Sequence, residues 1–100
     1  MITLTDLERI VPDMIERLEY ISGQMSKYKK INTDYRAKTL MNEIAAKIRQ
    51  VEKVHAAYKA TPSYKNKDFT NWVNIVENYI RECQYIYEKI MAYEGVAGYN

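Results

Sequence analysis

The chain has 100 residues, 47% of them hydrophobic and 28% charged, with a net charge of +2 at pH 7, and this composition is that of one folded domain rather than a disordered segment. Its single cysteine excludes an internal disulfide bond, and three glycines and two prolines leave little of the chain for turns. No apolar run approaches the ~20 residues of a membrane span, and the acidic start is not that of a signal peptide, so we expect a cytoplasmic protein without a membrane segment.

The first predicted helix covers residues 6–30 and carries apolar side chains at alternating spacings of four and three residues, which places them on one buried face. This stripe consists of Leu7, Val11, Met14, Leu18, Ile21, Met25 and Tyr28. Thr5 and Glu8 have the spacing of a capping box, which predicts a start at Asp6. Because Pro12 lacks a backbone donor, we expect it to kink the helix or to begin a second one.

The second predicted helix covers residues 33–60 and shows the same alternating spacing. Its stripe consists of Ala37, Met41, Ile44, Ile48, Val51, His55 and Tyr58. Asn32 or Thr33 is the expected cap at its start. Thr61 should end the helix, because a residue that precedes proline avoids helical backbone angles.

The third predicted helix covers residues 68–94. Its main stripe consists of Phe69, Trp72, Val76, Tyr79, Cys83, Ile86, Ile90 and Tyr93, and a parallel column consists of Val73, Ile80 and Tyr87. Asp68 is the expected N-terminal cap, and Gly95 is the expected stop.

Three such helices with short connections, about residues 29–33 and 60–67, predict an all-α fold in which neighbouring helices run antiparallel. We therefore expect an up-down-up three-helix bundle, with residues 1–95 as a single domain and residues 96–100 as a flexible C-terminal tail. The alternative is an open helical hairpin that completes its core by oligomerising.

His55, the only histidine, follows Glu52 by three residues, a spacing that di-iron helical bundles use for metal ligands. Those sites need two such pairs and two further glutamates, so we predict no metal and no cofactor within one chain. We expect His55 to lie at the edge of the core, hydrogen-bonded to Glu8 or Glu52. A metal site shared between subunits through Glu52 and His55 is a weaker alternative.

No catalytic motif is present, and we predict no catalytic residue and no enzyme activity. Cys83 does not change this prediction. In an antiparallel pair of helices it lies roughly 16 Å from His55, whereas a nucleophile and its base must lie about 3 Å apart. We interpret Cys83 as a small buried apolar side chain.

Charge is distributed unevenly along the chain. Residues 25–67 carry eleven basic and three acidic side chains, whereas each flanking segment carries two basic and five acidic ones. One interpretation is nucleic-acid binding by a basic face of the second helix, through Arg36, Lys47, Arg49 and Lys53. The other is internal complementarity, in which a basic helix lies between two acidic ones.

Ten tyrosines are present, and several fall outside the apolar stripes, where a tyrosine can anchor a protein contact. The predicted protein-binding residues are Tyr20, Tyr64, Tyr85, Lys65 and Lys67. We predict a small non-catalytic protein that acts by binding a protein partner, as a homo-oligomer, an adaptor or an inhibitor of the kind that phages encode. Nucleic-acid binding is the alternative.

Overall fold

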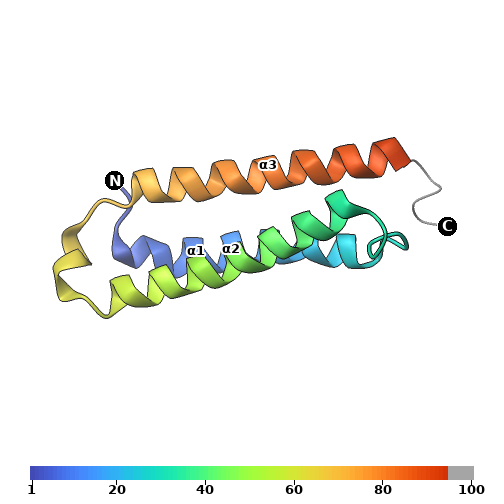
Figure 1. Cartoon of the computed structure of the whole chain (residues 1–100). Coiled ribbons are helices and arrows are strands. Elements are labelled where there is room, and N and C mark those ends of the chain that lie inside the picture. Colours follow the sequence, from blue (N-terminus) through green and yellow to red (C-terminus); the bar gives the residue numbers. More distant parts are fainter. Residues whose placement is uncertain (95–100) are drawn as a thin grey trace.

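The computed structural model describes residues 1–94, with side chains to residue 92, as an all-α bundle (Figure 1). Its elements are α1 (Leu4–Ser26), α2 (Tyr35–Lys59), the 3-10 helix η1 (Pro62–Asn66) and α3 (Thr70–Glu94). Helices α1 and α3 run in one direction and α2 runs back between them in sequence, which confirms the predicted up-down-up three-helix bundle. The molecule is a rod of 51 × 20 × 17 Å.

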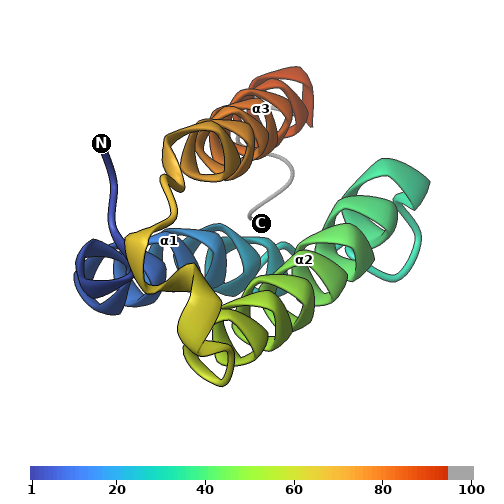
Figure 2. The same ribbon diagram turned by 90° about the vertical axis from the view of Figure 1, so that its left-hand side faces the viewer.

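Viewed along the rod, the three helices occupy the corners of a triangle, and η1, which follows α2 in the chain, packs against α1 and α2 at one end of the bundle (Figure 2). A single apolar cluster fills the centre, with buried side chains from all three helices. No helix in the described part of the chain is long and apolar enough to cross a membrane.

Helix α1 begins two residues before its predicted start. The Thr3 hydroxyl accepts from the Asp6 backbone amide at 3.2 Å, and the Asp6 carboxylate accepts from the Thr3 amide at 2.8 Å, so the capping box is formed by these two residues. The predicted box of Thr5 and Glu8 was wrong. Both pairs have the same three-residue spacing, and the earlier start leaves Glu8 free to face α2.

Pro12 does not begin a second helix, because α1 continues unbroken through it. The helix ends at Ser26, four residues before the predicted end, where a series of turns begins. In these turns the Asp34 and Thr33 amides both donate to the Lys30 carbonyl, at 2.7 and 3.0 Å.

Helix α2 is capped by Asp34, not by Asn32 or Thr33 as predicted. The Asp34 carboxylate accepts from the Arg36 amide at 2.9 Å and from the Ala37 amide at 3.3 Å. The turns that include residues 32 and 33 move the helix start two residues along the chain. The end at Lys59 agrees with the predicted stop before Pro62, but the 3-10 turn that Pro62 opens was not predicted.

The start of α3 is tied to the N-terminus of the chain. The Phe69 amide donates to the Ile2 carbonyl at 2.8 Å, while the Asp68 carboxylate accepts from the Thr70 amide at 2.9 Å and from the Ile2 amide at 3.2 Å. Asp68 therefore satisfies a helix-start amide as predicted, although the helix begins at Thr70. The predicted stop at Gly95 and the predicted tail 96–100 lie outside the described residues.

Burial confirms the predicted first stripe, because all seven residues are buried: six lie in α1, and Tyr28 lies just beyond its end. The other two helices bury a broader or shifted face. On α3 the parallel column supplies Val73 and Ile80 to the core, whereas Trp72, Tyr79 and Ile86 of the main stripe are only half-buried. The buried face of α3 is thus centred between the two predicted columns, because α3 packs against two helices at once.

Candidate protein-binding groove

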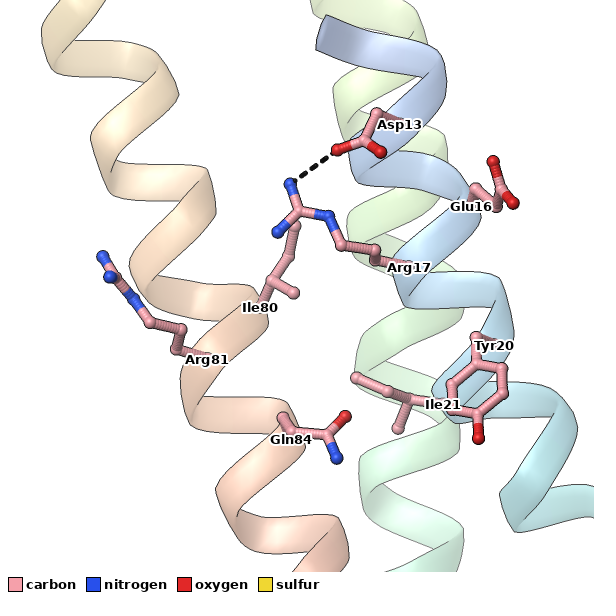
Figure 3. Close-up of a pocket in the computed structure, with 8 residues that line it drawn as sticks. All are labelled: Asp13, Glu16, Arg17, Tyr20, Ile21, Ile80, Arg81 and Gln84. Atoms are coloured by element: carbon pink, nitrogen blue, oxygen red, sulfur yellow. Dashed lines mark ion pairs between the residues drawn. The ribbon is translucent and has the colours of Figure 1, made fainter.

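A groove of about 410 Å³ lies between the middle of α1 and the middle of α3 (Figure 3). Its lining combines apolar and charged side chains from both helices. These are Asp13, Glu16, Arg17, Tyr20 and Ile21 of α1 and Ile80, Arg81 and Gln84 of α3. The groove lies in the middle of the rod. Because both helices line it, its geometry depends on the packing of α1 on α3.

Arg17 fixes the relative position of the two helices at this groove. Its Nη1 donates to Glu77 Oε2 at 2.8 Å, its Nη2 bonds to the other oxygen of the same carboxylate, and Nη2 also lies 3.0 Å from Asp13 Oδ2. A two-pronged bond of this kind sets both distance and orientation. The guanidinium is therefore held in place before any partner arrives.

The hydrogen bonds from Arg17 hold the pKa of the Glu77 carboxyl below its usual value, and the same bonds raise the pKa of Arg17. The Arg17 Nε is buried and has no hydrogen-bond partner within the described chain. Both groups remain charged at neutral pH, and Arg17 lines the groove.

The floor of the groove is apolar and its edges are polar. Ile21 and Ile80 are buried and belong to the core cluster. At the edge, Tyr20 is 61% exposed. Glu16 and Arg81 are also exposed, and the Arg81 guanidinium donates to the Asn78 side-chain oxygen at 2.5 Å. An apolar floor beside an exposed tyrosine, with charges on both edges, is the composition of a protein contact site.

The five predicted protein-binding residues divide between two places. Tyr20 lines the groove, and Tyr85 is 57% exposed on α3, one residue beyond Gln84, with the Lys89 Nζ 5.0 Å from its ring centre. The other three, Tyr64, Lys65 and Lys67, lie in or beside η1. Thr5 lines a groove together with Lys65 and so marks the level of this second group. Along α1, Thr5 lies fifteen residues from Tyr20, which is roughly 22 Å. The two groups therefore lie at different levels along the rod.

Tyr64 is half-buried, contrary to the expectation of an exposed tyrosine. Its ring packs edge-on against Tyr58 at 5.0 Å between ring centres and lies 6.4 Å from the Phe69 ring. The Lys67 ammonium lies 4.8 Å from the Tyr64 ring centre. These side chains cover the end of the core. Tyr64 and Lys67 therefore have a structural role within the chain.

Lys65 lines a second groove, of about 350 Å³, at the η1 end of the molecule. Glu8 lies at this groove, with its Oε1 3.4 Å from Lys59 Nζ and 3.6 Å from His55 Nε2. The His55 side chain is 13% exposed, so it lies at the edge of the core beside Glu8, as predicted, although Nε2 makes no hydrogen bond within the described residues. Glu52 is exposed.

No group of three or more His, Cys, Asp or Glu side chains in the described range could hold a metal ion. Cys83 is buried, which raises the pKa of its thiol. The charges of Glu43 and Lys47 act on that thiol, so it lies level with the middle of α2. His55 lies eight residues beyond Lys47, about 12 Å along the helix.

The four basic residues proposed for nucleic-acid binding do not form one stripe. Arg36 and Lys47 are eleven residues apart, close to three whole turns, and so share a face, whereas Arg49 and Lys53 lie on a different one. Lys47 already makes contacts within the chain, since its Nζ lies 4.6 Å from the Tyr79 ring centre and 2.9 Å from the Gln50 side-chain oxygen. Arg49 and Lys53 are exposed.

The predicted charge complementarity between the acidic α1 and the basic α2 is present in the pair of Glu8 with Lys59. The two-pronged ion pair, however, joins the two acidic helices α1 and α3, through Arg17 and Glu77. This pair was not predicted from the sequence. A usable signal was present, because Arg17 directly precedes Leu18 of one buried stripe and Glu77 directly follows Val76 of another. Ile75, which is 57% exposed on α3, was also missed.

Comparison of the chain with protein-family models, with curated proteins and with solved structures gives no match.

Proposed function

We propose that this chain is a small non-catalytic protein that binds a protein partner at the groove between α1 and α3. The observation that carries the proposal is the composition of the groove: an apolar floor of Ile21 and Ile80 with the exposed ring of Tyr20 at its edge. The partner that fits presents an apolar side chain to this floor and charges opposite to those of Glu16 and Arg81. In this proposal the protein acts in the cytoplasm.

Pre-organisation supports the same proposal. Arg17 is held by Glu77 and Asp13 in the unbound chain, so binding does not have to order this side chain. Ordering a long side chain on association costs roughly 0.5–1.5 kcal/mol, which a prearranged guanidinium avoids. The proposal leaves open the roles of homo-oligomer, adaptor and inhibitor, which share this surface.

The test is an enrichment experiment in cells of the source organism with the tagged full chain and two variants. Tyr20→Asp places a charge in the groove, and Tyr35→Asp places the same charge at a tyrosine that is 82% exposed outside the groove lining. We expect a protein, which can be an untagged copy of this chain, that the wild type and Tyr35→Asp retain and Tyr20→Asp loses. If every enriched protein binds all three equally, the groove is not the contact surface.

Nucleic-acid binding is the second candidate, and of the four predicted residues Arg49 and Lys53, together on one exposed face of α2, support it. A salt titration of duplex binding decides it, because a phosphate-dominated complex weakens steeply as salt increases. The double variant Arg49→Gln, Lys53→Gln should lower the salt slope, and Arg36→Gln should act less. Absence of binding at low salt would remove this candidate.

A further inference from the structure

The two edges of the α1–α3 groove carry opposite charge. On the α1 edge, Glu16 is exposed and forms no ion pair within the described residues, while the positive charge of Arg17 is taken up by Glu77 and Asp13. On the α3 edge, Arg81 is exposed, and its hydrogen-bond partner is the uncharged Asn78. The groove therefore has a negative edge on one helix and a positive edge on the other.

These edges are complementary to themselves under a simple rotation. Helices α1 and α3 run in the same direction (Figure 1). A half-turn about an axis that lies along the groove, parallel to both helices, places α1 of one copy opposite α3 of the other and keeps every residue at its own level along the rod. Two-fold interfaces of this kind use one surface patch on both subunits, so each contact occurs twice.

The levels of the charged residues allow such contacts. The bond from Arg17 to Glu77 and the shared lining by Ile21, Ile80 and Gln84 align the two helices in the groove. In Figure 3 Arg81 projects from the outer side of α3, and Glu16 projects from the outer side of α1. Glu16 lies one residue before Arg17 and Arg81 lies four residues beyond Glu77, so their backbones differ in level by about 7.5 Å along the rod. An arginine and a glutamate side chain together span that offset.

We propose that the occupant of the groove is a second copy of this chain, in a two-fold dimer in which Glu16 of each copy pairs with Arg81 of the other. The exposed ring of Tyr20, at the same edge as Glu16, then covers the apolar floor and meets the opposite Arg81, an arrangement that favours cation–π contact. This inference rests on the proposed function and names its partner.

The size of the molecule agrees with a dimer of this kind. A rod of 51 × 20 Å in projection offers a long face of about 1,000 Å², and a stable interface buries roughly 800 Å² on each partner. The groove lies in the middle of that length, so a dimer of this area requires contacts along both helices on either side of the groove. A contact confined to one end of the rod would not reach the required area.

The experiment measures solution mass by sedimentation equilibrium over a wide concentration range, for the full chain and four variants. The wild type should approach twice the mass of the chain. Glu16→Arg and Arg81→Glu each bring two pairs of like charges together, so each should weaken dimerisation by at least about tenfold. The double variant Glu16→Arg, Arg81→Glu restores opposite charges and should restore the dimer. Lys53→Glu, outside the groove lining, is the matched control and should leave the mass unchanged.

All the substituted side chains are exposed. Circular dichroism of each variant, recorded before its mass is measured, should show that it remains helical. A wild type that is monomeric throughout, or a double variant that stays as weak as the single ones, overturns the second-copy inference. The proposed function then stands if the enrichment experiment finds a different protein that Tyr20→Asp loses, and falls if it finds none. Loss of the dimer in Lys53→Glu alone would place the interface between copies on α2 and overturn the second-copy inference.

Discussion

At the scale of single residues, Arg17 has the most consequential contacts near the groove. It joins α1 to α3 through both oxygens of Glu77 and also pairs with Asp13 within α1. Its side chain is 40% exposed and that of Glu77 is 27% exposed, so solvent weakens the attraction without removing it. The pair therefore contributes more to the register of the two helices than to total stability.

Replacing Arg17 by methionine keeps the length of the side chain and removes the charge. We expect the free energy of unfolding to fall by about 1–2 kcal/mol, because the Glu77 carboxylate loses its partner while it remains partly buried. Urea unfolding at neutral pH measures the loss. Arg9→Met, at an exposed position of the same helix, is the control and should cost less than about 0.5 kcal/mol. Equal losses in the two variants would show that the ion pair contributes nothing specific.

The same pair gives stability a dependence on acid. Because Arg17 lowers the pKa of Glu77 below its ordinary value of 4.5, the contribution of the pair is complete above that value and is lost as pH falls through the lowered pKa of the folded state. Unfolding curves of the wild type and Glu77→Gln should therefore differ at neutral pH and converge as the pH falls below 4.5. A constant difference down to the lowest pH would contradict an ionised Glu77.

At the scale of elements, the buried stripe of α1 could be predicted from the sequence, whereas the helix starts could not. Seven apolar residues at regular spacing define one face whatever the neighbouring helices do. A helix start depends on which of several nearby polar side chains reaches the free amides. Thr3 and Thr5 each have an acidic residue three positions later, and Asn32, Thr33 and Asp34 are all suitable caps.

Substitutions at Asp34 and Asn32 distinguish the possible N-terminal caps of α2. Asp34→Ala removes the acceptor for the Arg36 and Ala37 amides, and we expect a loss of about 1 kcal/mol in the free energy of unfolding. Asn32→Ala, at one of the two caps that the sequence predicted, should change it by less than about 0.5 kcal/mol. The reverse order of the two losses would show that α2 begins earlier than Tyr35.

The η1 element explains why two tyrosines that look alike in the sequence differ in the structure. Tyr64 packs on Tyr58 and Phe69, whereas Tyr85 is 57% exposed. Tyr64→Ala should lower the melting temperature through a loss of about 2 kcal/mol, and Tyr85→Ala should leave it nearly unchanged. Periodicity alone could not give this difference, because η1 is not part of any helical stripe. A stable Tyr64→Ala variant would contradict the packing at this end.

At the scale of the whole molecule, the bundle was predictable because three amphipathic segments with short connections have few other ways to bury their apolar faces. The groove was not predictable in the same way. It depends on the rotation of α3 about its axis, and the buried face of that helix lies between two apolar columns of similar strength. Tyr20 was identified from the sequence as an exposed anchor, but its neighbours Arg81 and Gln84 come from a residue pairing that only the packed structure defines.

The most direct test of the groove as the contact surface is a set of amide nitrogen–proton NMR spectra of the full chain, recorded from dilute to concentrated solution. We expect the signals that shift with concentration to gather at Glu16, Tyr20 and Arg81 and their neighbours, while those of Arg49 and Lys53 stay fixed. Shifts that gather on α2 while the groove signals do not move, or spectra that stay the same at every concentration, would contradict self-association through α1 and α3.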